Sequence, residues 1–251
     1  MIVMRLKYIL ILSVITIVIS CDQNNNKVTS NNAELQKSSQ KRVLLILPVS
    51  LESRRNEFLL NINNALLNID SFSEINGWKE LCVEDFMDSV MIFDNKEKFN
   101  LTLLRLTKTD ESVKLPDTYC AALENRTLLT VTPEYYSKVY PDGIENNSFE
   151  KLLTHEIAHR LHIRILNGNE EAMGPIWFYE GFAMYAANQF TGSDVVLTKK
   201  EIIDLMNEPE RGSYKKYIYI FRYFVGKIPL KELVSKAKNK DFNEEMIKQI
   251  K

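Results

Sequence analysis

Apolar residues fall in short runs in the first half of the chain and recur at helical spacing in the second half. A periodic segment predicts a helix at 54–69, and short runs bounded by polar residues predict strands at 42–48, 89–93, 101–106, 119–123 and 127–131, the first of them buried. After Pro133 nearly every segment has helical spacing. This order predicts an α+β fold, with a small mixed sheet (sheet-rich part 42–132) before a mainly helical part (133–251).

Residue types at both ends delimit one helix near the middle of the chain. Asn147 is a candidate N-cap with Glu150 three residues later, and Asn167-Gly168 supplies a stop after Leu166. The apolar stripe between these ends consists of Leu152, Leu153, Ile157, Ala158, Leu161 and Ile165. We therefore expect one face of this helix to be buried.

The same helix carries all three histidines of the chain, two of them in the motif H-E-x-x-H at 155–159. Residues four apart on a helix lie on one face, roughly 5–6 Å apart, so His155 and His159 can present ring nitrogens to one ion. Glu156 is rotated about the axis, where it would act on a water as general base and would not bind the metal. The motif thus predicts a catalytic zinc site that needs a third protein ligand.

A second helical segment, 176–185, follows a turn-forming stretch and reads IWFYEGFAMY. H-E-x-x-H followed about twenty residues later by W-x-x-E-G-F-A-x-Y resembles the gluzincins, zinc peptidases with a thermolysin-like catalytic domain. The resemblance implies Zn²⁺ as cofactor, Glu180 as third ligand and a peptide or protein substrate. The aminopeptidase N family has two residues fewer in the intervening stretch and an asparagine where this chain has Tyr179, but the insertion lies in a polar loop.

Segment 213–224 is a predicted aromatic-rich helix that ends at Gly226. It resembles the Y-x-K-x-x-x-V-x-R segment of aminopeptidase N relatives, in which the leading tyrosine stabilises the oxyanion, and Tyr214 holds that position. A packing role remains open for Tyr214. For the other tyrosines of the segment, Tyr217, Tyr219 and Tyr223, packing is the preferred interpretation, because aromatic stripes usually belong to the core.

The sequence AALEN at 121–125 is similar to the G-A-M-E-N substrate strand of the same aminopeptidases. There the glutamate holds the substrate amino terminus, which would make Glu124 a substrate-binding residue. The first glycine of the motif is absent here, and an edge strand beside the active cleft would explain the segment equally well through backbone pairing.

A metzincin pattern fits less well, because it requires glycine three residues after the second histidine and a further histidine three residues later. Those positions hold His162 and Ile165. His162 lies roughly 10 Å along the helix axis from His155, by the rise per residue, and is too far away to complete the same site. We expect His162 to be structural or to support the ligands by hydrogen bonding.

The first twenty residues resemble a bacterial lipoprotein signal peptide: a basic start, an apolar segment 8–19, and V-I-S-C at 18–21. The resemblance implies cleavage before Cys21 and lipidation of its thiol, with the chain anchored in the cell envelope. An uncleaved anchor or an ordinary secretory peptide is the alternative, and which membrane holds the chain is undecided. Residues 22–41 are polar, as expected for a flexible tether between the lipid and a domain at 42–251.

Composition adds three constraints. Without the signal peptide, 30 basic and 33 acidic side chains remain, and this balance gives no indication of nucleic-acid binding. With Cys21 lipidated, Cys82 and Cys120 are an even pair that either forms a disulfide or stays as two buried thiols. Oligomeric state, endopeptidase or exopeptidase mode, and the role of 42–115 are not indicated.

The sequence thus predicts a lipid-anchored zinc metallopeptidase. Two other classes of protein remain as alternatives. One is a surface-binding lipoprotein whose zincin fold binds zinc without turnover, and the other is a structural lipoprotein without metal. The complete set of predicted ligands and base argues against both.

Overall fold

The computed structural model describes residues 43–250. The expected signal peptide, Cys21 and tether all lie outside these residues. Within 43–250, no helix combines the length and the apolar character that crossing a bilayer requires.

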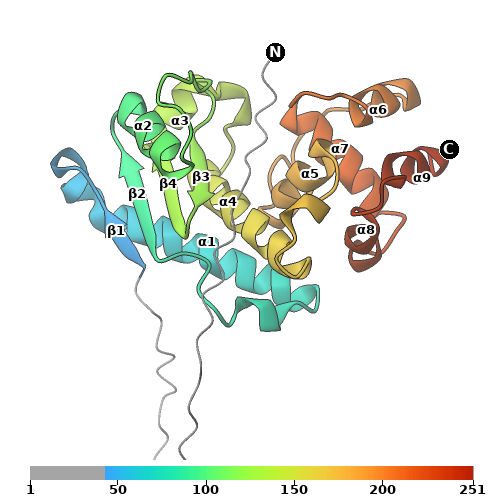
Figure 1. Cartoon of the computed structure of the whole chain (residues 1–251), viewed down its shortest axis with the longest axis horizontal. Helices are drawn as coiled ribbons and strands as arrows, with labels where there is room; N and C mark the ends of the chain where they lie inside the picture. Colours follow the sequence, from blue (N-terminus) through green and yellow to red (C-terminus); the bar gives the residue numbers. More distant parts are fainter. Residues whose placement is uncertain (1–42, 251) are drawn as a thin grey trace, which may run out of the picture. The chain divides into compact units, whose positions relative to one another are not determined.

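A four-stranded mixed sheet occupies the first half of the described chain (Figure 1). Its order is β1 (Leu44–Ile46), β2 (Ser89–Phe93), β4 (Thr127–Val131) and β3 (Ala121–Glu124). The first three strands are parallel, and β3 is antiparallel to β4. The predicted α+β fold with a small mixed sheet is therefore confirmed, and β2 and β4 have the predicted bounds.

Two strand predictions were wrong in part or whole. The predicted strand 101–106 lies inside helix α2 (Lys96–Leu106), because Asn95 caps Lys98 N and the buried residues Phe99 and Leu103 are one helical turn apart. The predicted buried strand 42–48 is the short edge strand β1, in which only Leu45 is buried.

Helices dominate the second half of the described chain, as predicted. The helices other than α2 are α1 (Arg55–Ile75), α3 (Pro133–Val139), α4 (Ser148–Ile165), α5 (Ile176–Ala186), α6 (Lys199–Met206), α7 (Tyr214–Val225), α8 (Leu230–Lys236) and α9 (Phe242–Lys248). Short 3₁₀ turns lie at Val49–Arg54, Lys79–Cys82, Pro141–Gly143 and Glu170–Ala172. Figure 1 shows α1 alongside α4, with α5 to α9 gathered on the side of α4 away from the sheet.

Helix α4 is the central element, because it packs against α1, α5 and β3. Its C-terminal stop is confirmed: Gly168 has a φ of 82° and donates to Ile163 O, the closing bond of a Schellman-type end. Asn147 does occupy the N-cap position, but its side chain makes no capping bond. Glu150 instead accepts from Asn64 and Asn68 of α1, so it fixes α4 to α1 rather than closing a capping box.

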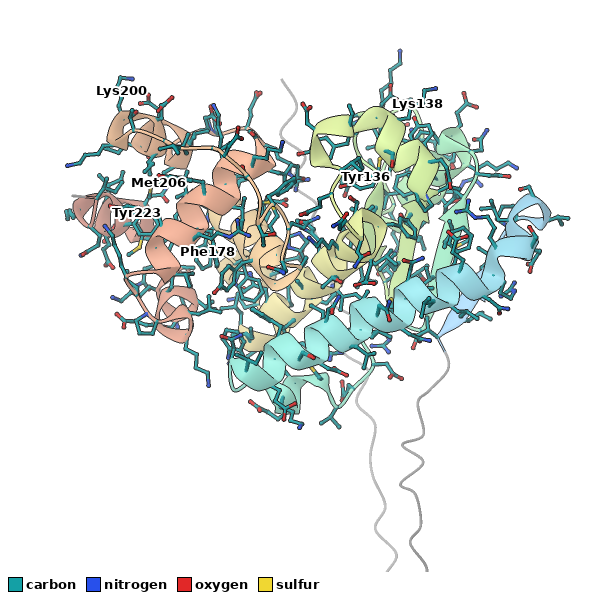
Figure 2. All side chains as sticks on the ribbon, turned by 180° about the vertical axis from the view of Figure 1, so that it is seen from behind. Tyr136, Lys138, Phe178, Lys200, Met206 and Tyr223 are labelled. Atoms are coloured by element: carbon teal, nitrogen blue, oxygen red, sulfur yellow. The ribbon has the colours of Figure 1, made fainter. Side chains whose placement is uncertain are left out.

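The helical half has an aromatic core. Phe178 of α5 is fully buried and contacts Phe221 of α7 and Phe242 of α9, with ring centroids 5.3 and 5.1 Å apart. Figure 2 shows Phe178 in the interior, whereas Lys138 and Lys200 point outward. This packing holds α5 in a fixed position against α7 and α9.

The two cysteines of the described chain are free thiols, so the disulfide that the sequence allowed is not formed. Cys120 is buried, and Cys82 donates to Ser73 Oγ at 3.1 Å.

Candidate metal centre

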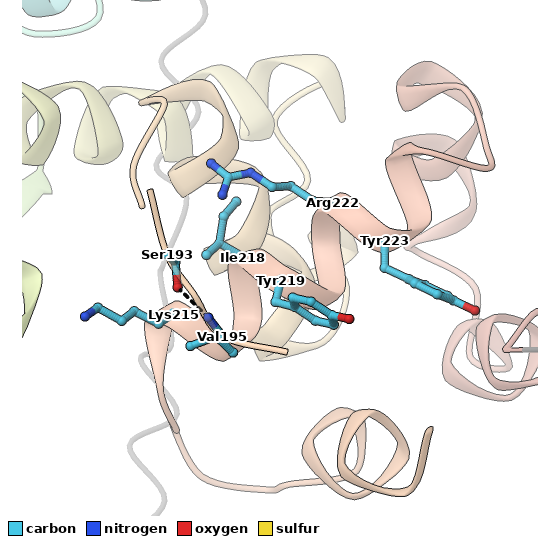
Figure 3. A pocket seen from close by; sticks show the side chains of 7 residues that line it. All are labelled: Ser193, Val195, Lys215, Ile218, Tyr219, Arg222 and Tyr223. Atoms are coloured by element: carbon cyan, nitrogen blue, oxygen red, sulfur yellow. Dashed lines mark hydrogen bonds between the residues drawn. The ribbon is translucent and has the colours of Figure 1, made fainter. Parts of the chain in front are cut away.

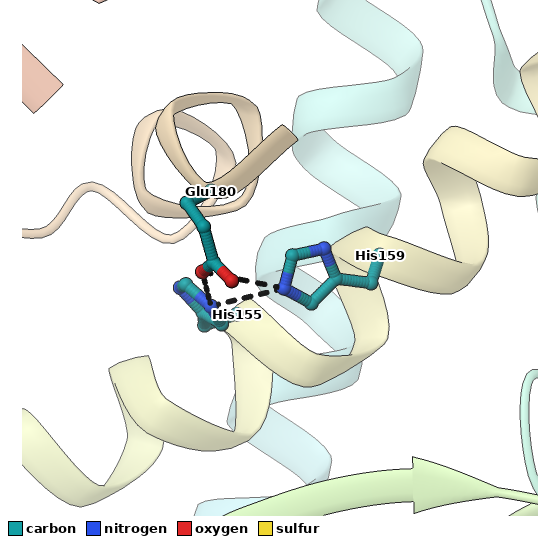
Figure 4. Close-up of side chains that lie close together, drawn as sticks. All are labelled: His155, His159 and Glu180. Atoms are coloured by element: carbon teal, nitrogen blue, oxygen red, sulfur yellow. Dashed lines mark hydrogen bonds and ion pairs between the residues drawn. The ribbon is translucent and has the colours of Figure 1, made fainter. Parts of the chain in front are cut away.

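Three side chains that the sequence placed on two separate helices come together in the structure: His155 and His159 from α4, and Glu180 from α5 (Figure 4). The Nε2 atoms of the two histidines are 3.1 Å apart. Oε2 of Glu180 lies 3.2 Å from Nε2 of His155 and 3.7 Å from Nε2 of His159. Two imidazole nitrogens and one carboxylate oxygen therefore converge on one point, and the group could hold a metal ion.

Local structure explains why the donors meet. The two histidines are one helical turn apart on the same face of α4. Gly181 follows Glu180 in α5, and a Cβ atom there would lie 2.7 Å from Cβ of Phe221 in α7. Only glycine permits this close approach of α5 and α7, which helps to fix the position of the neighbouring Glu180.

Burial gives the cluster its electrostatic character. His155 and Glu180 are buried, with only 1% of Glu180 exposed. Oε2 of Glu180 has no hydrogen-bond partner anywhere in residues 43–250. A buried carboxylate oxygen without a donor is costly, and a cation shared with the two imidazoles would satisfy it. The donor set therefore fits a metal ion.

Burial and the charges of neighbouring side chains shift the pKa values of all three donors. Burial alone would lower the pKa of His155, but its interaction with the Glu180 carboxylate raises it. Burial would raise the pKa of Glu180, but His155 and Arg211 lower it to about 2, so the carboxylate stays ionised. Burial, together with the neighbouring His155, lowers the pKa of His159 to about 3. A neutral imidazole and an ionised carboxylate are the metal-binding forms of these side chains.

Two supporting residues were missed by sequence reasoning. Oε1 of Gln189 lies 3.0 Å from Nδ1 of His155, and the backbone carbonyl of Gln189 accepts from Arg222. Nη2 of Arg211 lies 2.8 Å from Oε1 of Glu180. Both residues come from loops, after α5 and before α7, and no spacing motif marks a glutamine or an arginine for such roles.

Glu156 and Tyr214 also lie at this cluster. Burial raises the pKa of Glu156 to about 7; the charge of His155 acts against this shift and that of Glu180 adds to it. The ring of Tyr214 lies 6.1 Å from that of His155, centroid to centroid, in an edge arrangement. Burial also raises the pKa of Tyr214 well above its ordinary value.

Glu124 lies at the end of β3, the edge strand that packs against α4. Arg160, one residue after His159, donates to Leu123 O at 2.7 Å and lies 3.9 Å from the Glu124 carboxylate. The edge-strand environment that the sequence left open for this segment is therefore present. Glu124 is also one of the charges that influence the pKa of Glu156.

His162 is not part of the donor cluster. It is fully buried, and its ring stacks on Phe182 with the centroids 4.4 Å apart. Neither of its ring nitrogens has a hydrogen-bond partner in the described part of the chain. Burial lowers the pKa of His162 to about 3, so it is a neutral packing residue.

A separate pocket of about 380 Å³ lies along α7 (Figure 3). It is lined by Ser193, Val195, Lys215, Ile218, Tyr219, Arg222 and Tyr223, and by none of the three donor residues. Arg222 is committed to the backbone carbonyls of Gln189 and Phe190, which accept from its two terminal nitrogens. The pocket is thus a surface hollow that is separate from the three donor residues.

Comparison with known proteins found no matching family model, no matching curated protein and no matching solved structure. The function must therefore be inferred from the residues of the site.

Proposed function

We propose that this protein is a zinc-dependent peptidase of the gluzincin type, in which His155, His159 and Glu180 bind the metal and Glu156 is the general base. The observation that carries the proposal is the convergence of three donors from two helices, two of them buried and His159 half-buried, beside an acid of the H-E-x-x-H motif. Two histidines and one glutamate are the protein ligands of a known class of catalytic zinc site.

The donor spacing is compatible with a tetrahedral zinc ion. Ligand atoms at about 2.0–2.2 Å from a tetrahedral ion are separated from one another by about 3.3–3.6 Å. The three separations between donor atoms here are 3.1, 3.2 and 3.7 Å. Imidazole together with a single carboxylate favours zinc over magnesium or calcium, which prefer all-oxygen sites.

Bound zinc supplies a lowered pKa for a catalytic water and polarisation of the scissile carbonyl. Glu156 takes the proton from the attacking water and gives it to the leaving amine. In the chain without metal, burial raises the pKa of Glu156 to about 7, and a carboxyl group with a pKa near neutral accepts and releases a proton at little cost.

Tyr214 is proposed as the oxyanion donor. Its high pKa keeps the hydroxyl protonated, as a hydrogen-bond donor must be. Its ring contacts both His155 and Tyr140, which restricts the directions in which the hydroxyl can point.

The substrate would be a peptide or protein that pairs with the edge strand β3 in extended conformation. Glu124, at the end of this strand, is the proposed partner of the substrate amino terminus, as its resemblance to the aminopeptidase motif implies.

We also propose a lipid anchor at Cys21 in a bacterial cell envelope, on the basis of the V-I-S-C sequence and the polar stretch after it. Such an anchor would put the catalytic site outside the cytoplasm.

Incubation of the whole chain with a peptide library, with zinc measured on the same sample, tests the proposed activity. Zinc-dependent cleavage that a chelator abolishes supports a peptidase. Stoichiometric zinc without cleavage of any peptide would favour the alternative, a zinc-binding surface lipoprotein without turnover.

A further inference from the structure

The two carboxylate oxygens of Glu180 have different partners. Oε2 faces the Nε2 atoms of His155 and His159, while Oε1 lies 2.8 Å from Nη2 of Arg211. Glu180 itself is 99% buried, whereas the side chain of Arg211 is 44% exposed. The arginine therefore reaches into the site from the surface and pairs with the other carboxylate oxygen, Oε1.

Arg211 is held in place by the residues on either side of it. The hydroxyl of Tyr217 accepts from Gly212 N at 2.5 Å and donates to Glu210 O at 3.3 Å. Tyr217 is fully buried in α7, so its hydroxyl is a fixed point. A Cβ atom on Gly212 would lie 3.0 Å from this hydroxyl, which explains the glycine at that position.

We infer that Arg211 is a positioning residue that makes Glu180 a one-oxygen ligand of the metal. This inference rests on the proposed metal site. A carboxylate can bind a cation through one oxygen or both. The planar guanidinium holds Oε1 in an ion pair, and only Oε2 is left for the ion. One coordination position then remains for water and substrate, as a catalytic zinc site requires.

A purely structural role makes a different prediction. If Arg211 only balanced the charge of a buried carboxylate, its loss would change stability and leave the coordination of the bound metal unaltered. The number of ligand atoms around the ion therefore distinguishes the two roles.

The test uses the whole chain with cobalt(II) in place of zinc. Visible absorption of cobalt(II) is strong in four-coordinate sites and weakens when a fifth ligand atom binds. The variants are Arg211→Gln, Arg211→Lys and Tyr217→Phe. Arg105→Gln is a matched control, because Arg105 is an exposed arginine on α2 that pairs with Glu111. Zinc affinity is measured on the same proteins by competition with a chelator.

We expect Arg211→Gln to weaken zinc binding by about 10–100-fold, the scale for losing a group that supports a ligand. Its cobalt absorption should weaken, because Oε1 becomes free to bind. Arg211→Lys should recover part of the zinc affinity and part of the cobalt absorption. Tyr217→Phe should lower both quantities too, but by less than Arg211→Gln does. A wild-type cobalt spectrum in Arg211→Gln would overturn the inference, whatever its affinity. Failure of the wild-type chain to bind either metal would instead overturn the proposed function.

Discussion

Nδ1 of His155 and Oε1 of Gln189 are 3.0 Å apart, and this contact determines which nitrogen of the imidazole faces Glu180. An amide oxygen only accepts hydrogen bonds, so Nδ1 is the protonated nitrogen and Nε2 carries the lone pair. The backbone carbonyl of Gln189 is in turn fixed by Arg222 at 2.7 Å. A loop residue thus orients a candidate ligand that belongs to a helix, an arrangement that is common around metal-binding histidines.

This contact predicts that Gln189→Leu weakens zinc binding by about 10–100-fold, the usual effect of removing a hydrogen-bond partner from a ligating histidine. Gln189→Glu keeps the acceptor and should bind zinc at least as tightly as wild type. Chelator competition measures both affinities, and Gln249→Leu at an exposed position is the control. Equal affinities for Gln189→Leu and wild type would show that the contact does not support the ligand.

The role of Glu156 predicts a separation of metal binding from activity. Glu156→Gln preserves the shape and removes the base, so zinc should stay bound while peptide hydrolysis falls by about 10²–10⁴-fold. Zinc content and kcat on one cleaved peptide are the measurements, with Glu244→Gln on the exposed surface of α9 as control. Cleavage by Glu156→Gln at the wild-type rate would remove Glu156 from the mechanism.

For Tyr214, loss of the hydroxyl should affect only the transition state. Tyr214→Phe should keep zinc and lower kcat by about 10²–10³-fold with little change in KM, the scale for one oxyanion donor. Tyr219→Phe, in the pocket on α7, is the matched control and should be nearly silent. If Tyr214→Phe is silent too, the tyrosine is a packing residue. Tyr217 is then a poor replacement, because its hydroxyl binds the backbone of Glu210 and Gly212.

The burial of His162 predicts that the folded protein loses stability in acid, independently of any catalysis. Burial lowers the pKa of His162 from about 6.5 to about 3, so below pH 6.5 the unfolded chain binds a proton that the folded chain does not. Stability is therefore full above pH 6.5 and falls towards pH 3, by about 3–5 kcal/mol for this one group. His162→Leu should remove this loss, because leucine does not titrate.

Urea unfolding of wild type and His162→Leu between pH 7 and pH 4, both with a chelator, measures this difference. The variant should gain stability relative to wild type as the pH falls, since the two share every other titrating group. If the unfolding free energies of wild type and His162→Leu changed in parallel between pH 7 and pH 4, His162 would not be a buried neutral ring.

The sequence predicted those parts of the fold that depend on local pattern. The runs at 89–93 and 127–131 are apolar and sharply bounded, and they are strands β2 and β4. The run at 101–106 was misassigned because its helical partner, Phe99, lies outside it, as does the cap at Asn95. Exposure of β1 depends on its place at the sheet edge, which a run of apolar residues does not reveal.

In the candidate site, too, the sequence predicted the residues that follow a local pattern and missed those that tertiary contacts bring together. His155 and His159 could be placed together from helical spacing alone, whereas Glu180 needed a resemblance to known zinc peptidases. Gln189 and Arg211 reach the site through tertiary contacts between loops and helices, and no local pattern records such contacts.

The central claim is that His155, His159 and Glu180 together hold one catalytic zinc ion. Elemental analysis of the whole chain, wild type beside Glu180→Ala, tests it most directly. The account predicts one zinc per wild-type chain and a strong loss in the variant, because two histidines form an incomplete chelate. Wild-type protein that takes up no zinc, or a Glu180→Ala variant that keeps its full content, would contradict it.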